Sequence, residues 1–103
     1  MLAGIIIAFA IGASGSIVVD AGAKRALVEG GRSLLPAGIV SVSGDFGADD
    51  AVELVGPDGE VFAKGLVRHA ADDVARWAGH RSEDLPEDVA AEMVHRDDLV
   101  VLG

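Results

Sequence analysis

The sequence contains no cysteine, and only four of its 103 residues are aromatic. The absence of thiols excludes disulfides and thiolate metal sites, and it favours a reducing compartment, so we expect a cytoplasmic protein. Because aromatic rings are so few, the core must consist of Val, Leu, Ile and Ala side chains. A chain of this length is expected to fold as one domain around one core.

Basic residues are scarce and unevenly distributed. Eight lysines and arginines stand against 17 acidic residues, which gives a net charge of −9. Residues 1–45 are neutral overall, so the whole excess of negative charge lies in residues 46–103. A domain that binds nucleic acid through phosphates normally presents a basic stripe. This chain, taken as a whole, would repel a polyanion.

The sequence also lacks an apolar run long enough to span a membrane. Its opening run, MLAGIIIAFAIGA, has 13 residues, whereas a spanning helix needs about 20. The first basic residue is Lys24, so the run lacks the basic start of a signal peptide. We therefore predict no membrane partner, and we interpret residues 1–16 as a connection between domains or an altered start. A buried strand is the alternative.

The tripeptide His95-Arg96-Asp97 resembles the start of the catalytic loop of protein kinases. That loop continues with Leu and needs an Asn that holds magnesium, but Asp98 stands at the Leu position and the sequence contains no Asn. The residues after Asp98 are too few to complete an active site. We therefore interpret the tripeptide as part of a tight polar turn between two short strands, EMV and LVVL.

Two short helices are predicted. The strand SIVVD ends at Asp20, which should cap a helix over AGAKRALVEGG, and the final two glycines should end that helix. The segment ADDVARWAGH predicts a second helix with acidic residues in its first turn. In this helix we interpret Trp77 as a core anchor, Gly79 as the stop, and His80 as a cap at the carbonyl end.

Extended runs account for most of the remaining sequence. IVSVS predicts a half-exposed strand, and AVELV and EVFAKGLV predict a hairpin because the Pro57-Asp58-Gly59 turn joins them. The acidic segment RSEDLPEDVAAE is predicted to be a surface loop or one weak helical turn. Together these patterns predict a mainly β fold, with about six short strands and two short helices forming a small, mostly antiparallel barrel.

Residues for catalysis or metal binding do not cluster in the sequence. His69, His80 and His95 are too far apart for the spacing of a zinc site. Three pairs of adjacent aspartates are interpreted as turn or helix-start residues, because neighbouring side chains point apart on a strand or helix. We therefore predict no catalytic, metal or cofactor site in this chain.

Five segments, in this order, resemble the PUA domain found at the C-terminus of glutamate 5-kinases: DAGA, SLLPAGI, GDF, AGH and HRDD. The resemblance extends over residues 17–102, and we assign residues 17–103 to a PUA domain. It implies a PUA-like mixed β pseudo-barrel with two helices, in agreement with the pattern derived from the residues alone.

The resemblance also implies a parent enzyme of proline biosynthesis that phosphorylates the side-chain carboxylate of L-glutamate with ATP and magnesium. In that family the chemistry belongs to an amino-acid-kinase domain of about 250 residues, which is longer than this whole chain. We expect that kinase domain as a partner in the same polypeptide, and this chain as an accessory domain without catalysis. One hypothesis is a regulatory or assembly module that affects proline feedback, magnesium dependence or homo-oligomer contacts.

The other hypothesis is RNA binding, because PUA domains elsewhere bind RNA through the first helix and the strand and turn that follow it. By position, this surface would carry Lys24, Arg25 and Arg32, with Lys64 and Arg68 as neighbours. We favour ordinary solvated charges instead, since the net charge of the domain opposes a polyanion. Any RNA binding should be weak and salt-sensitive. A stand-alone RNA-binding module of an RNA-modification or translation-related protein is the alternative function.

Overall fold

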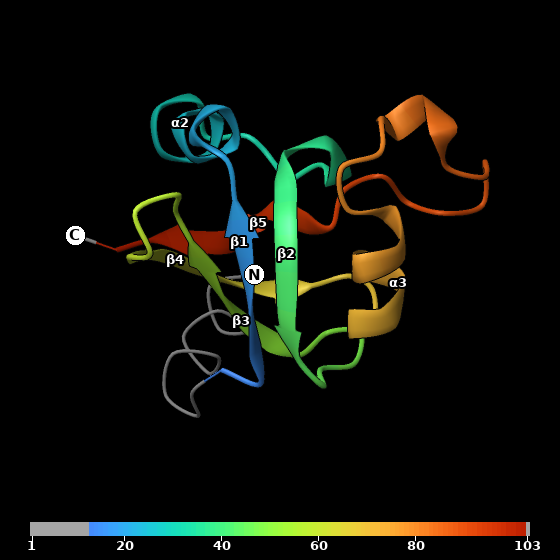
Figure 1. Cartoon of the computed structure of the whole chain (residues 1–103), viewed down its shortest axis with the longest axis horizontal. Coiled ribbons are helices and arrows are strands. Elements are labelled where there is room, and N and C mark those ends of the chain that lie inside the picture. Colours follow the sequence, from blue (N-terminus) through green and yellow to red (C-terminus); the bar gives the residue numbers. More distant parts are fainter. Residues whose placement is uncertain (1–12, 103) are drawn as a thin grey trace.

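The computed structural model describes residues 13–102, in which one curved sheet is packed against two helices (Figure 1). The helices are α2 (Ala21–Gly30) and α3 (Ala71–Trp77), and η1 (Pro36–Gly38) and η2 (Ser82–Asp84) are short 3-10 turns. The mainly β class with two helices is thus confirmed, while most of the opening apolar run lies outside the described residues. Within them the strands are β1 (Gly15–Val19), β2 (Ile39–Gly44), β3 (Ala51–Val55), β4 (Val61–Val67) and β5 (Val94–Val101).

The sheet is mixed and partly closed on itself. Its strand order is β2-β1-β3-β4-β5; β1 and β3 run parallel, while the other neighbouring strands run antiparallel. The segment before η1 reaches across to the far edge, where Leu34 forms an antiparallel bridge with Val94 of β5. The N–H of Leu34 donates to the Val94 carbonyl at 2.8 Å. Because this bridge links the chain entering one edge strand to the opposite edge strand, the predicted pseudo-barrel is confirmed.

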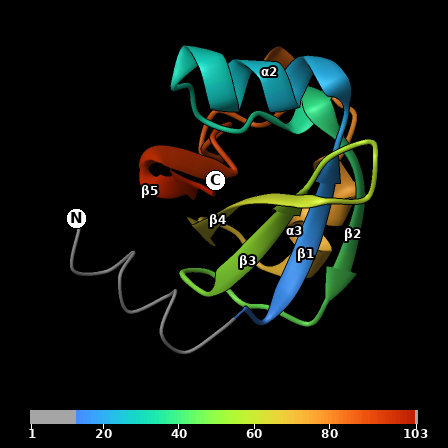
Figure 2. The same ribbon diagram turned by 90° about the vertical axis from the view of Figure 1, so that its left-hand side faces the viewer.

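Helix α2 begins and ends where the sequence predicts. Asp20 precedes the helix in an extended conformation, and its Oδ1 accepts a hydrogen bond from the N–H of Ala23 at 2.7 Å. This bond satisfies one of the donors that a first helical turn leaves free. Gly31 follows with a φ of 59°, in the left-handed region that glycine adopts without strain. The helix lies across one end of the sheet, above β5 (Figure 2).

The predicted hairpin is also confirmed. Strands β3 and β4 pair antiparallel, and Gly59 in the turn has a φ of 84°. Asp58 orders the turn because its Oδ1 accepts a hydrogen bond from the N–H of Glu60 at 3.2 Å. This hydrogen bond lowers the pKa of the Asp58 carboxyl, and the nearby Lys24 ammonium lowers it further.

The predicted turn at Asp97 and Asp98 is wrong, because β5 continues through both residues as one strand. Both apolar runs pair with the same neighbour: Val94 lies opposite Val67, and Leu99 lies opposite Gly65 of β4. The register shifts between these pairs, so an irregularity absorbs the extra polar residues without reversing the chain. The described residues therefore form five strands where the sequence predicted six.

The core is mostly aliphatic, as expected, but it also contains Phe46, Phe62 and Met93; the described buried side chains are all apolar. Val74 of α3 is fully buried, while Trp77 is half-buried and packs against the core, in agreement with its predicted role as an anchor. The end of α3 differs in detail. The backbone N–H of His80, and not its imidazole, donates to the Trp77 carbonyl at 2.9 Å, and the His80 ring packs edge-on against the indole.

The acidic segment after α3 is a loop with one short helical turn, as predicted. It contains η2, and Leu85 anchors it to the core. His69 also contacts it, since Nε2 lies 2.8 Å from the carbonyl oxygen of Ala90. Within residues 13–102, none of the helices has the length and apolar character needed to cross a membrane.

Candidate functional site

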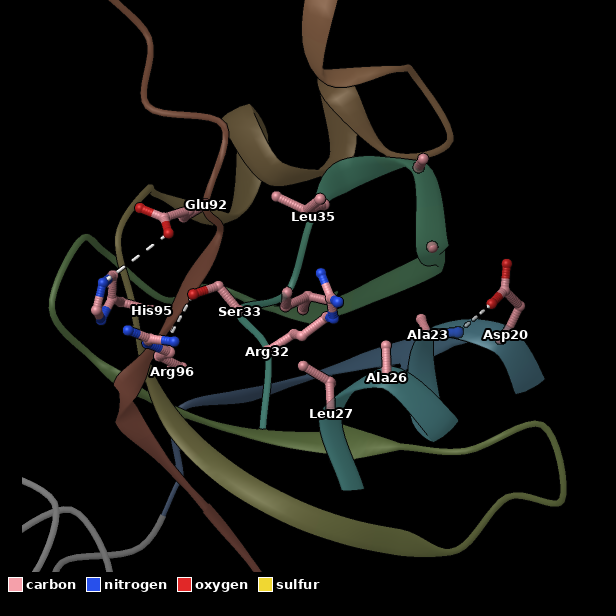
Figure 3. Close-up of a pocket in the computed structure, with 14 residues that line it drawn as sticks. Asp20, Ala23, Ala26, Leu27, Arg32, Ser33, Leu35, Glu92, His95 and Arg96 are labelled. Carbon is pink, nitrogen blue, oxygen red and sulfur yellow. Dashed lines mark hydrogen bonds and ion pairs between the residues drawn. The ribbon is translucent and has the colours of Figure 1, made fainter. Parts of the chain in front are cut away.

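An open groove of about 590 Å³ lies between α2, the segment 32–38 and the start of β5 (Figure 3). Helix α2 supplies one wall, and the segment leading into η1 supplies the other. The first residues of β5 and the preceding Glu92 complete one end of the groove. Three segments far apart in the sequence therefore meet here.

Backbone pairing fixes the relative positions of these segments. Leu34 pairs with the chain at the start of β5: its N–H donates to the Val94 carbonyl, and its carbonyl accepts the N–H of Met93, each at 2.8 Å. One step away, Ser33 Oγ accepts a hydrogen bond from the N–H of Arg96 at 2.9 Å. The side chains of Arg32 and Arg96 are thus held on neighbouring, paired stretches of backbone.

Helix α2 approaches the other wall closely at Gly38. A Cβ atom at this position would overlap the Cβ of Ala23, so the contact requires glycine. The groove wall here consists of small side chains, including Ala23, Ala26 and Ala37. Leu35 adds a larger apolar side chain that is 44% exposed. The groove therefore offers an apolar surface that is open to solvent.

Charged groups of both signs surround this apolar surface. Arg32 and Arg96 line the groove together with Asp20 and Glu92. The two guanidinium groups have no hydrogen-bond or ion-pair partner among residues 13–102. An unpaired guanidinium presents a planar fork of donors that matches a carboxylate or phosphate.

His95 lies between acidic side chains at the β5 end of the groove. Its Nε2 is 3.9 Å from Glu92 Oε2, and its Nδ1 is 3.6 Å from Asp97 Oδ2. The N–H of Asp97 also lies 3.1 Å from His95 Nδ1, to which it donates a hydrogen bond. The kinase-like tripeptide therefore lies at the rim of the groove, where His95 contacts nearby acids and Arg96 contacts the distant Ser33.

The structure brings one of the five predicted RNA-contacting residues, Arg32, into the groove. Arg25 is exposed on α2 outside the groove, and Lys64 lies on β4 opposite Glu53. The other two, Lys24 and Arg68, form ion pairs with aspartates.

The Lys24 ammonium lies 3.7 Å from Asp58 Oδ2 and 5.5 Å from the centroid of the Phe62 ring. Arg68 Nη2 lies 3.8 Å from Asp98 Oδ2. These contacts place Lys24 and Arg68 in separate ion pairs, away from the lining of the groove.

Sequence reasoning missed Ser33, Glu92, His95 and Arg96 as groove residues. His95 and Arg96 were noticed within the tripeptide, but were interpreted as part of a turn. The decisive contact joins Arg96 to Ser33, 63 positions earlier. No local pattern reveals such a contact, because it depends on how the sheet closes.

No group of three or more His, Cys, Asp or Glu side chains within the described range is arranged to hold a metal ion. The groove instead combines cationic, anionic and apolar surface. Its chemistry is that of recognition: it can hold a ligand through complementary charge and apolar contact.

The sequence pattern of the PUA domain matches residues 15–88, which is most of the chain. The chain belongs to the PUA domain family. Among curated proteins, it is 50% identical over 100 residues to glutamate 5-kinase of Myxococcus xanthus, covering 93% of this chain and 26% of that protein. It is 46% identical over 94 residues to glutamate 5-kinase of Mycobacterium avium, covering 91% of this chain and 26% of the relative. The predicted resemblance is thus confirmed.

A solved structure supports the same fold. The PUA domain protein APE0525 of Aeropyrum pernix K1, crystallised as a tartrate complex, has a TM-score of 0.60 and is 25% identical, over 89% of this chain and 50% of that chain. The chain spans about a quarter of the length of the curated relatives it matches.

Proposed function

We propose that this PUA domain is a non-catalytic accessory domain of a cytoplasmic enzyme resembling glutamate 5-kinase, an ATP- and magnesium-dependent kinase of proline biosynthesis. One observation carries the proposal: the chain is about half identical to glutamate 5-kinases over nearly its whole length, yet it corresponds to only a quarter of theirs. The amino-acid-kinase domain would lie in the remaining part of the polypeptide and would perform the phosphoryl transfer.

The accessory role we favour is regulation or assembly of the parent enzyme. The chain has a net charge of −9, the core of residues 13–102 has no buried polar side chain, and the groove holds charged groups on paired stretches of backbone. Such a rigid body can dock on a second domain and change its response to effectors without contributing reacting atoms.

Deletion of the domain from the full-length enzyme tests this role. We expect the truncated enzyme to retain glutamate phosphorylation while its inhibition by proline, its magnesium dependence or its oligomeric mass changes. The measurements are steady-state kinetics with a proline titration and light scattering. Kinetics and oligomeric mass identical to those of the intact enzyme would reject the proposal.

RNA binding is the second candidate, and the unpaired guanidinium groups of Arg32 and Arg96 are the observation that favours it. The archaeal Cbf5 complex of the box H/ACA sRNP includes a chain with the same fold, with a TM-score of 0.57 at 22% identity. Because the whole chain carries −9, we expect only weak RNA binding.

A titration with a structured RNA at low and high salt tests this candidate. We expect any affinity to fall steeply as salt rises, since phosphate contacts release counterions. Tight binding that survives high salt would instead support a stand-alone RNA-binding module.

A further inference from the structure

The groove carries balanced charge on a strongly acidic domain. Two arginines and two carboxylates line it, whereas the chain as a whole has a net charge of −9. A polyanion in the groove would be attracted by Arg32 and Arg96 but repelled by Asp20 and Glu92. A ligand with one positive and one negative group is attracted by both the arginines and the carboxylates. Because such a ligand has no net charge, the negative charge of the domain does not repel it.

The position of Arg32 suits such a ligand. Arg32 lines the same groove as Asp20 on the α2 side and Glu92 near the start of β5, and the view of Figure 3 draws its guanidinium between them. Because Arg32 is unpaired within residues 13–102, both edges of its fork are available for bidentate contact with a carboxylate.

The flanking acids have capacity for an ammonium group. Asp20 uses Oδ1 to accept the N–H of Ala23, which leaves Oδ2 for a ligand. Glu92 has a contact of 3.9 Å with His95, which is longer than a hydrogen bond. A primary ammonium brings three donors and can satisfy either carboxylate.

The surface between the charged groups is apolar and formed by small side chains. Ala23, Ala26 and Leu35 lie around Arg32 in the close-up (Figure 3). An aliphatic side chain placed here would cover exposed apolar area on both walls, which is favourable in water. The groove volume of about 590 Å³ lies in the range typical of small-molecule sites.

We propose that the groove binds the zwitterion of an α-amino acid with an aliphatic side chain. Arg32 holds the carboxylate, Asp20 or Glu92 holds the ammonium, and the side chain lies on Ala23, Ala26 and Leu35. The proposal concerns this domain alone and goes beyond its role in a parent enzyme, so its failure would leave the proposed accessory function unaffected.

An NMR titration of the isotope-labelled chain tests the proposal with L-leucine as the probe. We expect saturable shifts of amide signals in α2, in residues 32–38 and in residues 92–96. Two analogues remove one charge each: 4-methylpentanoate lacks the ammonium, and 3-methylbutylamine lacks the carboxylate. Each should bind at least about tenfold more weakly, as expected when a charge-assisted contact is lost. Absence of saturable shifts, or equal binding of either analogue, would overturn the proposal.

Variants with matched controls locate the contacts. Arg32→Ala should weaken L-leucine binding at least about tenfold, while Arg25→Ala, which removes the same charge from α2 outside the groove, should change it less than about twofold. Either Asp20→Asn or Glu92→Gln should weaken binding of L-leucine but not of 4-methylpentanoate; the Asn at position 20 retains helix capping.

Equal effects of the two arginine variants, or no effect of either acid variant, would contradict the assignment. A competing titration with single-stranded RNA distinguishes the ligand classes. If RNA displaces L-leucine at concentrations below those at which L-leucine itself saturates the groove, the groove is a phosphate site and the proposal of a zwitterion is wrong.

Discussion

Basic residues in two regions of the molecule have different surroundings. Lys24 of α2 forms an ion pair with Asp58 at the tip of the β3–β4 hairpin, and its ammonium lies over the Phe62 ring. In the groove, Arg32 and Arg96 have no such partner within residues 13–102. Other arginines among residues 13–102, such as Arg25 and Arg81, also lack an ion pair. Arg32 and Arg96 differ from them because they line the groove, where one ligand could contact charged and apolar surface together.

The two regions also differ in what holds them together. The groove rests on buried apolar side chains and on backbone pairing between the segment 33–34 and β5. The hairpin tip is an exposed turn, stabilised by the Lys24–Asp58 ion pair, whose side chains are 32% and 51% exposed. Exposed ion pairs contribute little to stability, whereas buried apolar contacts contribute much. Substitutions should therefore have larger effects in the framework of the groove.

The largest effect should follow from Leu34→Ala. Leu34 is 1% exposed and forms the bridge to Val94 that closes the barrel beneath the groove. Truncating a buried leucine loses the burial of its methyl groups and leaves a cavity, which together lower the free energy of unfolding by about 2 to 5 kcal/mol. Urea unfolding measures the loss. The neighbouring Leu35→Ala is the control, since Leu35 is 44% exposed; equal losses for both variants would show that burial of the Leu34 side chain does not stabilise the framework of the groove.

A smaller effect is expected at the start of α2. Asp20→Ala removes the side chain that caps Ala23 N–H, and loss of such a cap costs about 1 kcal/mol. Asp20→Asn keeps an acceptor at the same place and should retain most of the stability. Thermal unfolding of the two variants separates capping from charge. If Asp20→Asn were as unstable as Asp20→Ala, the carboxylate charge and not the cap would be responsible.

Much of this fold could be predicted because its signals are local. Asp20, the glycines after α2 and the Pro-Asp-Gly turn act on their own neighbours, and each element they predict is present. The turn expected at residues 97–98 failed for a nonlocal reason. Aspartates tolerate an exposed edge strand, and the pairing of both flanking runs with β4 decided the conformation.

The groove was less predictable for the same physical reason. Arg32 was selected by its place after the first helix, but Arg96 joins the site only through backbone pairing with the segment 33–34. Charge signs along the chain also did not show which cations would be neutralised. Lys24 and Asp58 meet because the hairpin tip lies beside α2, a contact over 34 positions that depends on the packing of the whole barrel.

Ser33→Ala tests how far a single side-chain hydrogen bond holds β5 at the groove. It removes the hydroxyl that accepts the N–H of Arg96, at a partly exposed position where water can replace it. We expect a loss of about 0.5 kcal/mol, at the low end for a hydrogen bond. Amide hydrogen exchange of Arg96 is the more sensitive measurement and should become faster in the variant. Unchanged exchange at Arg96 would show that Ser33 does not fix β5 at the groove.

The smallest effect should come from Asp58→Asn at the hairpin tip, where the amide oxygen can still accept the N–H of Glu60. The folded state lowers the pKa of Asp58, through the Glu60 N–H first and Lys24 second. A lowered pKa means that the carboxylate stabilises the fold above the ordinary aspartate pKa of about 4 and that this contribution disappears as the pH falls through the folded value. The variant should therefore be slightly less stable than the wild type at pH 7 and equally stable in strong acid, as measured by urea unfolding at both pH values. A difference that persisted in acid, after the carboxylate is protonated, would mean that the side chain acts through packing, and that the hairpin tip is held in the same way as the groove.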